Sequence, residues 1–145
     1  RQSARCNERL SERGFLVAGY NISAELGEGI RILGPLGLYL KEIALLIELE
    51  RGYVALLGCT HYGIEKFFRS LDEIGVDRLI ALIGGLGVSK LDVLTLEYLL
   101  EELERRRIEM VVPLHTTSRG AREEILKKLG RQDIRCGVGF TISIS

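Results

Sequence analysis

The sequence lacks a net charge, a long apolar run and a paired-cysteine pattern, and each absence excludes a class of protein. Lys plus Arg and Asp plus Glu both number 20, so no net field draws the chain to a polyanion, and we expect no nucleic acid partner. The apolar runs end well before the ~18 residues that a membrane span needs. Cys6, Cys59 and Cys136 are an odd number without CxxC spacing, which argues against a disulfide framework and a thiolate zinc knuckle. We therefore expect a soluble, cytoplasmic protein with no membrane partner.

Amide side chains and methionine are also scarce. The chain has two Asn, two Gln and one Met beside 28% charged residues, a bias reported for proteins of hyperthermophiles. This composition favours a thermophilic source. The chain opens at Arg1 and its methionine is Met110, so we expect the native translation start to lie upstream, with a segment processed away, omitted or lost.

What the chain does have is enough apolar material for one core. It is 145 residues long and 46% hydrophobic, and a domain of this size buries roughly 70% of its unfolded surface. We expect a single domain over residues 1–145. Residues 1–40 are rich in glycine and weakly periodic, which predicts loops and short strands.

From residue 41 onward, a β-hairpin is followed by alternating helices and strands. The mixed charge run from Glu101 to Arg107 is expected to form a solvated helix face. Ser89 and Asp92 together resemble a capping box at the start of one helix, and Ser118 can cap another. The predicted elements are a hairpin of residues 43–49 and 53–57 around a turn at 50–52, a helix over 64–74 ending at Gly75, a strand over 78–83, a helix from about 92 to 107, a strand over 108–112, a helix over 118–129, and a final strand over 139–145.

This alternation predicts an α/β fold in which helices cover a mixed sheet. The two histidines, His61 and His115, each follow a predicted strand, and parallel strands point their carboxyl ends to one edge, where ligand sites form. Imidazole is a common metal ligand, but a catalytic zinc site needs at least three protein ligands. From spacing alone the histidines are either metal ligands or turn and cap residues bonded to the backbone.

Two other features have a functional and a structural interpretation. Cys59 could be a nucleophile activated by His61, but residues two apart at a strand-to-helix turn rarely point at one another, and an inert cysteine is more common. The glycine-rich segment 84–88 could hold a phosphate at a helix N-terminus. It lacks the later glycine of a dinucleotide fingerprint, so a tight turn is the simpler interpretation.

Three segments resemble the metallo-β-lactamase-fold superfamily. Residues 41–64 resemble its "glycine-cysteine-x-histidine-x-glycine" segment with the preceding hairpin. Residues 113–117 are similar to its closing "proline-x-histidine-cysteine-threonine" segment, and residues 137–142 resemble its last strand. The resemblance covers residues 40–145 and is nearest to the subgroup around dihydropterin ribofuranosylaminobenzene phosphate synthase.

The resemblance implies that the chain is the C-terminal half of a four-layer αββα metal-dependent hydrolase. His61 and His115 would be metal ligands, for zinc or another divalent transition metal, and the substrate would be a small-molecule ester or phosphoester. Three departures accompany it. The upstream "histidine-x-histidine-x-aspartate-histidine" motif is absent, Gly87 stands where the subgroup has histidine, and Thr116 replaces the cysteine of the last motif. No catalytic general base is assigned.

A half-sandwich leaves one sheet face bare, so we expect exposed apolar surface that is covered by self-association or by a complementary N-terminal half. With two histidines alone, the chain is expected to show no turnover. If the resemblance holds, the two histidines should share one sheet edge, with Cα atoms on the order of 10 Å apart or less. The alternatives are a truncated or degenerate α/β interaction module without catalysis, and an unrelated doubly wound binding domain. An upstream or neighbouring histidine-rich motif would favour the hydrolase.

Overall fold

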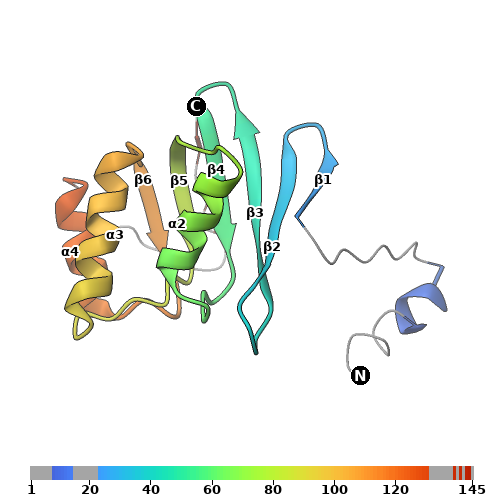
Figure 1. The fold of residues 1–145 in the computed structure, drawn as a ribbon, viewed down its shortest axis with the longest axis horizontal. Helices are drawn as coiled ribbons and strands as arrows, with labels where there is room; N and C mark the ends of the chain where they lie inside the picture. The colour runs from blue at the N-terminus through green and yellow to red at the C-terminus, as the bar shows by residue number, and fades with distance from the viewer. Residues whose placement is uncertain (1–7, 15–22, 131–138, 140, 142, 145) are drawn as a thin grey trace.

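The computed structural model describes residues 8–14, 23–130, 139, 141 and 143–144. Within them, one six-stranded sheet has its strands in chain order from β1 to β6 (Figure 1). The first four strands are antiparallel neighbours, whereas β4, β5 and β6 run parallel. This mixed sheet confirms the predicted fold class. The strands are β1 (Ala24–Gly27), β2 (Ile30–Leu36), β3 (Glu42–Leu49), β4 (Gly52–Leu57), β5 (Leu79–Gly84) and β6 (Met110–Pro113).

The hairpin of β3 and β4 has the predicted bounds to within a residue. Its register runs from Ala44 opposite Leu57 to Leu49 opposite Gly52, so the turn holds the two residues Glu50 and Arg51. Gly52 has a φ of 144°, a conformation that residues with a Cβ rarely adopt. The turn glycine therefore sets this register. The register in turn determines which residues of β3 lie beside the end of β4.

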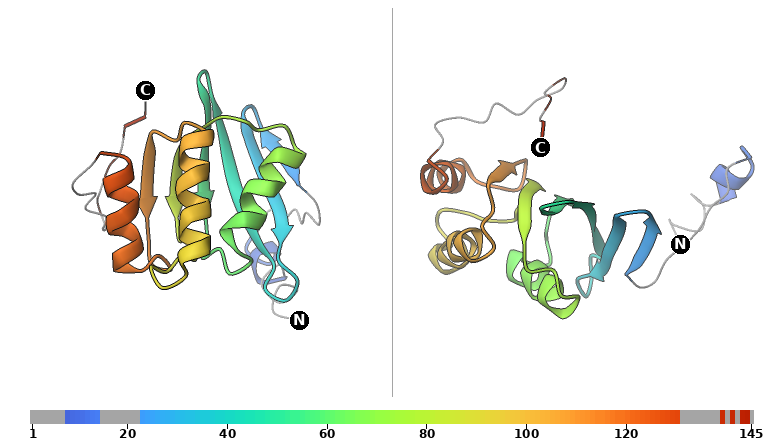
Figure 2. Two further views of the ribbon diagram at one scale, coloured as in Figure 1. Left: turned by 60° about the vertical axis from the view of Figure 1, so that its left-hand side comes forward. Right: turned by 90° about the horizontal axis from the view of Figure 1, so that it is seen from above.

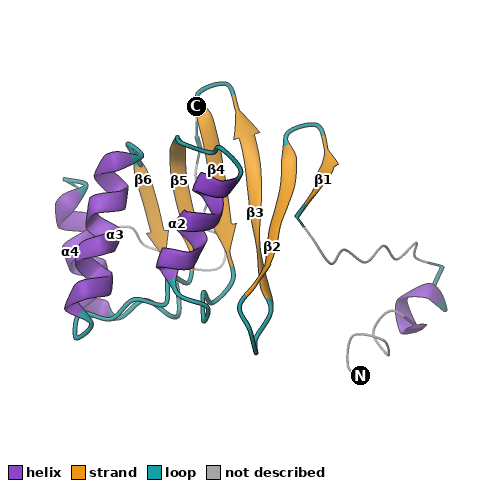
Figure 3. Cartoon of the chain, in the orientation of Figure 1, coloured by secondary structure: helices purple, strands orange, loops and turns teal. Residues whose placement is uncertain are grey.

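Three helices, α2 (Ile64–Glu73), α3 (Val93–Arg105) and α4 (Arg119–Lys128), confirm the predicted helical segments. They cover one face of the sheet (Figures 2 and 3). Ser118 caps α4 as expected, by accepting from the backbone N–H of Ala121. The cap of α3 is Asp92 rather than a box opened by Ser89. Of the predicted final strand, 139–145, residues 140, 142 and 145 lie outside the described residues, and the four described ones are not in a strand.

The face of the sheet under the helices holds the apolar core. Leu46, Ala55, Leu82 and Val111 come from four adjacent strands and are fully buried. They belong to one cluster with Phe67 of α2, Leu99 of α3 and Ile125 of α4. Burying one large apolar side chain stabilises the fold by about 1.5–3 kcal/mol. No helix among the described residues is long and apolar enough to cross a membrane.

The opposite face of the sheet is also apolar. Alternation along each strand turns one residue in two away from the helices, and pairing aligns these residues in a row across five strands. Most of the row is half-buried, and Ile43 beside it is 53% exposed. We call this surface the apolar face; its row consists of Ile32, Leu45, Leu56, Ile83 and Val112.

A buried arginine joins α2 to α3. Arg106, just after α3, is 1% exposed, so the expectation that residues 101–107 form a solvated face is wrong at this position. Its guanidinium donates to Glu102 Oε2 at 2.8 Å and to the carbonyl of Phe68 at 3.1 Å. It also donates to the carbonyl of Val76 and to the carboxylate of Asp72. These contacts join α2 and the loop that follows it to the end of α3.

The carboxylate of Asp72 makes the stability of this junction depend on pH. Partial burial raises the pKa of Asp72, but hydrogen bonds from Arg105 and the charge of Arg106 lower it by more, so the pKa lies below its ordinary value. A carboxyl with a lowered pKa stabilises the fold above its unfolded pKa of about 3.9, and this contribution is lost as the pH falls through the folded value. The side chain is 45% exposed, so screening keeps the contribution small.

We expect the free energy of unfolding, measured by urea denaturation, to decrease below about pH 4. The decrease should be smaller in Asp72→Asn. Asp77→Asn, which removes an exposed carboxylate from the next loop, is the control and should keep the wild-type pH dependence. The same acid loss in wild type and Asp72→Asn would contradict the assignment.

Candidate metal centre

The structure places His61 and His115 at one edge of the sheet. His61 follows β4 and His115 follows β6, and both strands run parallel to β5 between them. Their carboxyl ends therefore meet at the same edge, as expected for ligand sites in sheets of this kind. The loops that begin here span residues 58–63, 85–92 and 114–118.

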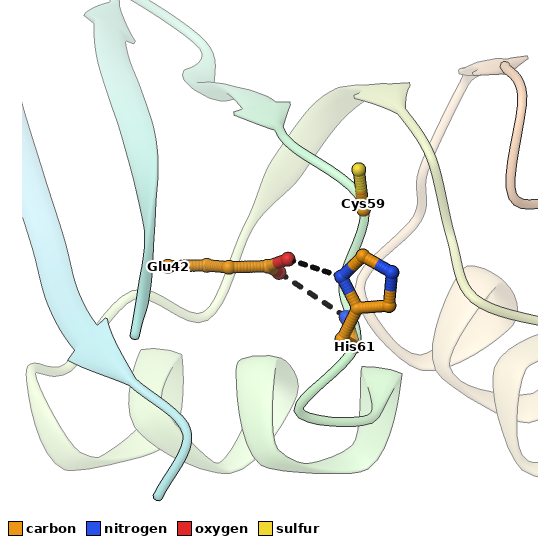
Figure 4. Close-up of side chains that lie close together, drawn as sticks. All are labelled: Glu42, Cys59 and His61. Carbon is orange, nitrogen blue, oxygen red and sulfur yellow. Dashed lines mark hydrogen bonds and ion pairs between the residues drawn. The ribbon is translucent and has the colours of Figure 1, made fainter. Parts of the chain in front are cut away.

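Glu42 fixes the orientation of His61. It is the first residue of β3, which the hairpin register places beside the end of β4. Its Oε1 lies 2.5 Å from His61 Nδ1, and its Oε2 accepts from the backbone N–H of His61 at 3.1 Å (Figure 4). A carboxylate that accepts from Nδ1–H holds the proton there and leaves the Nε2 lone pair for a metal ion. Glu42 is thus a positioning residue for His61.

Cys59 contacts the second histidine. Its Sγ lies 2.9 Å from His115 Nε2, across 56 positions of sequence. The backbones are joined as well, because Thr116 Oγ1 donates to the carbonyl of Cys59 at 2.8 Å. The cysteine is partly buried and the histidine is exposed. The first and last of the three loops are therefore connected through both side chain and backbone.

Ligand atoms of Glu42, Cys59 and His61 all lie within 4.8 Å of one another. Cys59 and His61 are near one another, but their polar contacts are with His115 and with Glu42, respectively. Thr60 between them has a φ of 59° and turns the chain sharply. This conformation is unusual for a β-branched residue and costs on the order of 1–3 kcal/mol. Burial of Thr60 and its 2.5 Å hydrogen bond to the carbonyl of Gly85 stabilise the turn.

The glycine-rich loop after β5 packs between the other two. A Cβ on Gly85 would lie 2.2 Å from Thr116 Oγ1, so only glycine lets the loops close. The N–H groups of residues 85, 86 and 87 donate to the carbonyl of Gly58 and to the hydroxyls of Thr117 and Thr116. These amides are already used within the fold, which favours the tight-turn interpretation over a phosphate cradle.

Gly87 stands where the resembled subgroup has histidine. Its φ is 64°, and a Cβ there would lie 2.7 Å from the carbonyl oxygen of Thr60. A side chain at this position would need the turn at Thr60 to move. The loop in this chain is therefore built for glycine, and any further donor to this edge must come from elsewhere.

Tyr62 follows His61 in the chain, and its side chain packs against the hydrophobic core. Burial raises the pKa of its hydroxyl well above the ordinary value, and the charge of Glu42 acts in the same direction. The hydroxyl thus stays protonated at neutral pH and carries no charge into the site.

Sequence reasoning predicted that both histidines lie at this sheet edge, but it missed the contact of Glu42 with His61. The carboxylate lies 19 residues before His61, and only the hairpin register brings the two together. The turn at Gly52 was a usable signal for that register. Cys59 was considered only as a nucleophile toward His61, whereas its closest histidine contact is His115.

Comparison with solved structures supports the fold. Tm1679, a metal-dependent hydrolase of the β-lactamase superfamily, matches with a TM-score of 0.74 and 21% sequence identity over 90% of this chain. The chain spans 58% of the length of that protein. No protein-family model and no curated protein sequence matches. The sheet and its helices thus have the fold of part of a metallo-β-lactamase-like protein, as the sequence resemblance predicts.

Proposed function

We propose that this chain supplies His61 and His115 to the metal centre of a hydrolase of the metallo-β-lactamase superfamily. The observation that carries the proposal is the convergence of both histidines on Cys59 at one sheet edge, with Glu42 orienting His61. The remaining ligands would come from a segment outside this chain, on the same native protein or on a partner.

The donors present fit a transition metal. Imidazole and thiolate suit zinc and other borderline or soft divalent ions, and less so magnesium or calcium. His61 would hold the ion through Nε2, since Nδ1 faces Glu42. When bound, such an ion would supply Lewis acidity and lower the pKa of its water molecule to about 7. We propose zinc as the metal, and a small-molecule ester or phosphoester as the substrate, as in the dihydropterin ribofuranosylaminobenzene phosphate synthase subgroup that the sequence resembles.

The apolar face is the proposed docking surface for the complementary half. Its row of five aliphatic side chains runs across the sheet on the side away from the helices. Contiguous apolar surface of this kind marks an interaction site in a folded protein. Self-association through the same face is the alternative arrangement.

A second candidate, an α/β interaction module without catalysis, is favoured by Gly87. The loop geometry leaves no room for a side chain there, so one donor of the resembled site is missing. Among the described residues, the carboxylate nearest the histidines is Glu42, and both its oxygens are used by His61. In this case the chain would keep its fold and would bind a partner through the apolar face, but it would not catalyse hydrolysis.

Zinc binding separates the two candidates. We expect the purified chain to bind one zinc ion weakly in calorimetric titration. Loss of a residue that only orients a ligand typically reduces metal affinity by about 10–100-fold. His61→Ala and His115→Ala each remove a direct ligand, so each should reduce the zinc affinity by more than this. Lys41→Ala, an exposed neighbour of Glu42, is the control and should leave the affinity unchanged.

Turnover provides the second test. The chain alone should hydrolyse neither phosphodiesters nor lactones with added zinc or manganese, because no carboxylate of the described residues is assigned to a water molecule. Turnover that survives His61→Ala, or zinc affinity that is equal in wild type and both histidine variants, would contradict the proposal.

A further inference from the structure

We propose that Cys59 binds the metal ion as a thiolate, together with His61 and His115, so that this chain alone carries a three-donor site. The inference rests on the proposed metal centre. It adds a donor that the sequence resemblance does not assign. It also makes a prediction about the chain without any complementary half.

The sulfur of Cys59 is near both histidines. It lies 2.9 Å from His115 Nε2 and within 4.8 Å of a ligand atom of His61. Zinc lies about 2.3 Å from sulfur and 2.0–2.1 Å from imidazole nitrogen, which places neighbouring tetrahedral donors roughly 3.5 Å apart. Binding of one ion by all three donors therefore requires the two imidazoles to rotate toward each other beside the sulfur.

The fold holds Cys59 in this place from three directions. Thr116 donates to its carbonyl, so the residue after His115 fixes the cysteine backbone. Gly85 packs against it, because a Cβ at position 85 would lie 3.2 Å from the Cα of Cys59. The left-handed turn at Thr60 brings His61 back toward the sulfur. The backbone that carries the proposed donors is therefore held by packing and hydrogen bonds before an ion binds.

Glu42 is a weaker candidate for the third donor. One of its oxygens faces His61 Nδ1 and the other accepts from the backbone of the same residue. Coordination by this carboxylate would break at least one of these contacts. The contact of the Cys59 sulfur is with His115, and His115 is the residue with which it would share the ion.

The contact between Cys59 and His115 could also be a nucleophile and its base. The two roles differ in what a metal ion does. A ligand thiolate gives a sulfur-to-metal charge-transfer band and is protected from alkylation by the metal. A free nucleophile gives no band, and its alkylation does not depend on the metal.

Cobalt titration of the reduced 145-residue chain tests the assignment. We expect Co²⁺ to produce an intense near-ultraviolet thiolate-to-cobalt band and to slow alkylation of Cys59 by iodoacetamide. Cys59→Ser should remove the band and weaken Co²⁺ binding by about 10-fold or more, as for a lost ligand or its outer partner. The double variant Cys6→Ser/Cys136→Ser is the matched control and should keep the band. Circular dichroism checks that each variant is folded.

The outcomes separate this inference from the proposed function. Cobalt binding without a thiolate band, lost in His61→Ala, would overturn the role of Cys59 and leave the histidine centre standing. A band that depends on Cys59 but not on either histidine would overturn the three-donor set and the proposed histidine ligands together. Absence of cobalt binding would overturn both proposals. Rapid alkylation that cobalt does not slow would assign Cys59 as a free nucleophile and overturn its role as a ligand.

Discussion

Replacing Arg106 by alanine should lower the free energy of unfolding by about 3–5 kcal/mol, the range for breaking a buried ion pair by removing one partner. The substitution leaves Glu102, which is 7% exposed, without one of its cations. It also removes the guanidinium that donates to the carbonyl of Val76. Unpaired buried acceptors each cost about 1–3 kcal/mol. Urea denaturation of wild type and variant measures the difference.

Two variants make the Arg106 experiment specific. Arg119→Ala removes an arginine whose side chain is 94% exposed and paired with Glu123, so its effect should be within about 0.5 kcal/mol. The double variant Glu102→Leu/Arg106→Met removes the buried charge with its partner and should recover part of the loss. A loss below about 1 kcal/mol in Arg106→Ala would contradict a supporting role for this guanidinium between α2 and α3.

Replacing Glu42 by alanine should weaken zinc binding by about 10–100-fold, the usual cost of losing the group that orients a ligand histidine. Without the carboxylate, neither the tautomer nor the ring orientation of His61 is fixed. Calorimetric titration measures the affinity, and ¹⁵N chemical shifts of the imidazole report the tautomer directly. A purely structural role would leave the tautomer unchanged.

Glu42→Gln should recover most of the affinity, since the amide oxygen can still accept from Nδ1–H. Glu48→Ala is the control on the same strand: its carboxylate pairs with Arg31 on the surface, and its loss should not change zinc affinity. If Glu42→Ala binds zinc like wild type and keeps the same tautomer, Glu42 has no positioning role.

The fold was predictable because its signals are local. The Gly52 turn sets the hairpin, Ser118 caps its helix, and apolar spacing marks α2, α3 and α4. The buried Arg106 was missed for the opposite reason. In sequence it belongs to a run of charges that is typical of a solvated face, and only the packing of α3 on α2 encloses it.

The candidate site was predictable in part. His61 and His115 stand out because each follows an apolar strand, and the rule for parallel strands brings them to one edge. Glu42 and the contact of Cys59 with His115 depend on pairing register and on the left-handed turn at Thr60. A β-branched residue gives no local sign that it will adopt such a turn.

The threonine hydroxyls between the loops affect the free energy of metal binding. Thr60 and Thr116 donate to carbonyls of neighbouring loops, and Thr117 accepts from an amide of the glycine-rich loop. Fixing the backbone of one residue costs about 1–2 kcal/mol of conformational entropy. In this chain, the folding of the sheet and its core already fixes the backbone of these loops before an ion binds. Small zinc domains instead use the ion to fold. In this chain, an ion should therefore bind to a rigid receptor, with its affinity set by donor chemistry and hardly reduced by ordering of the chain.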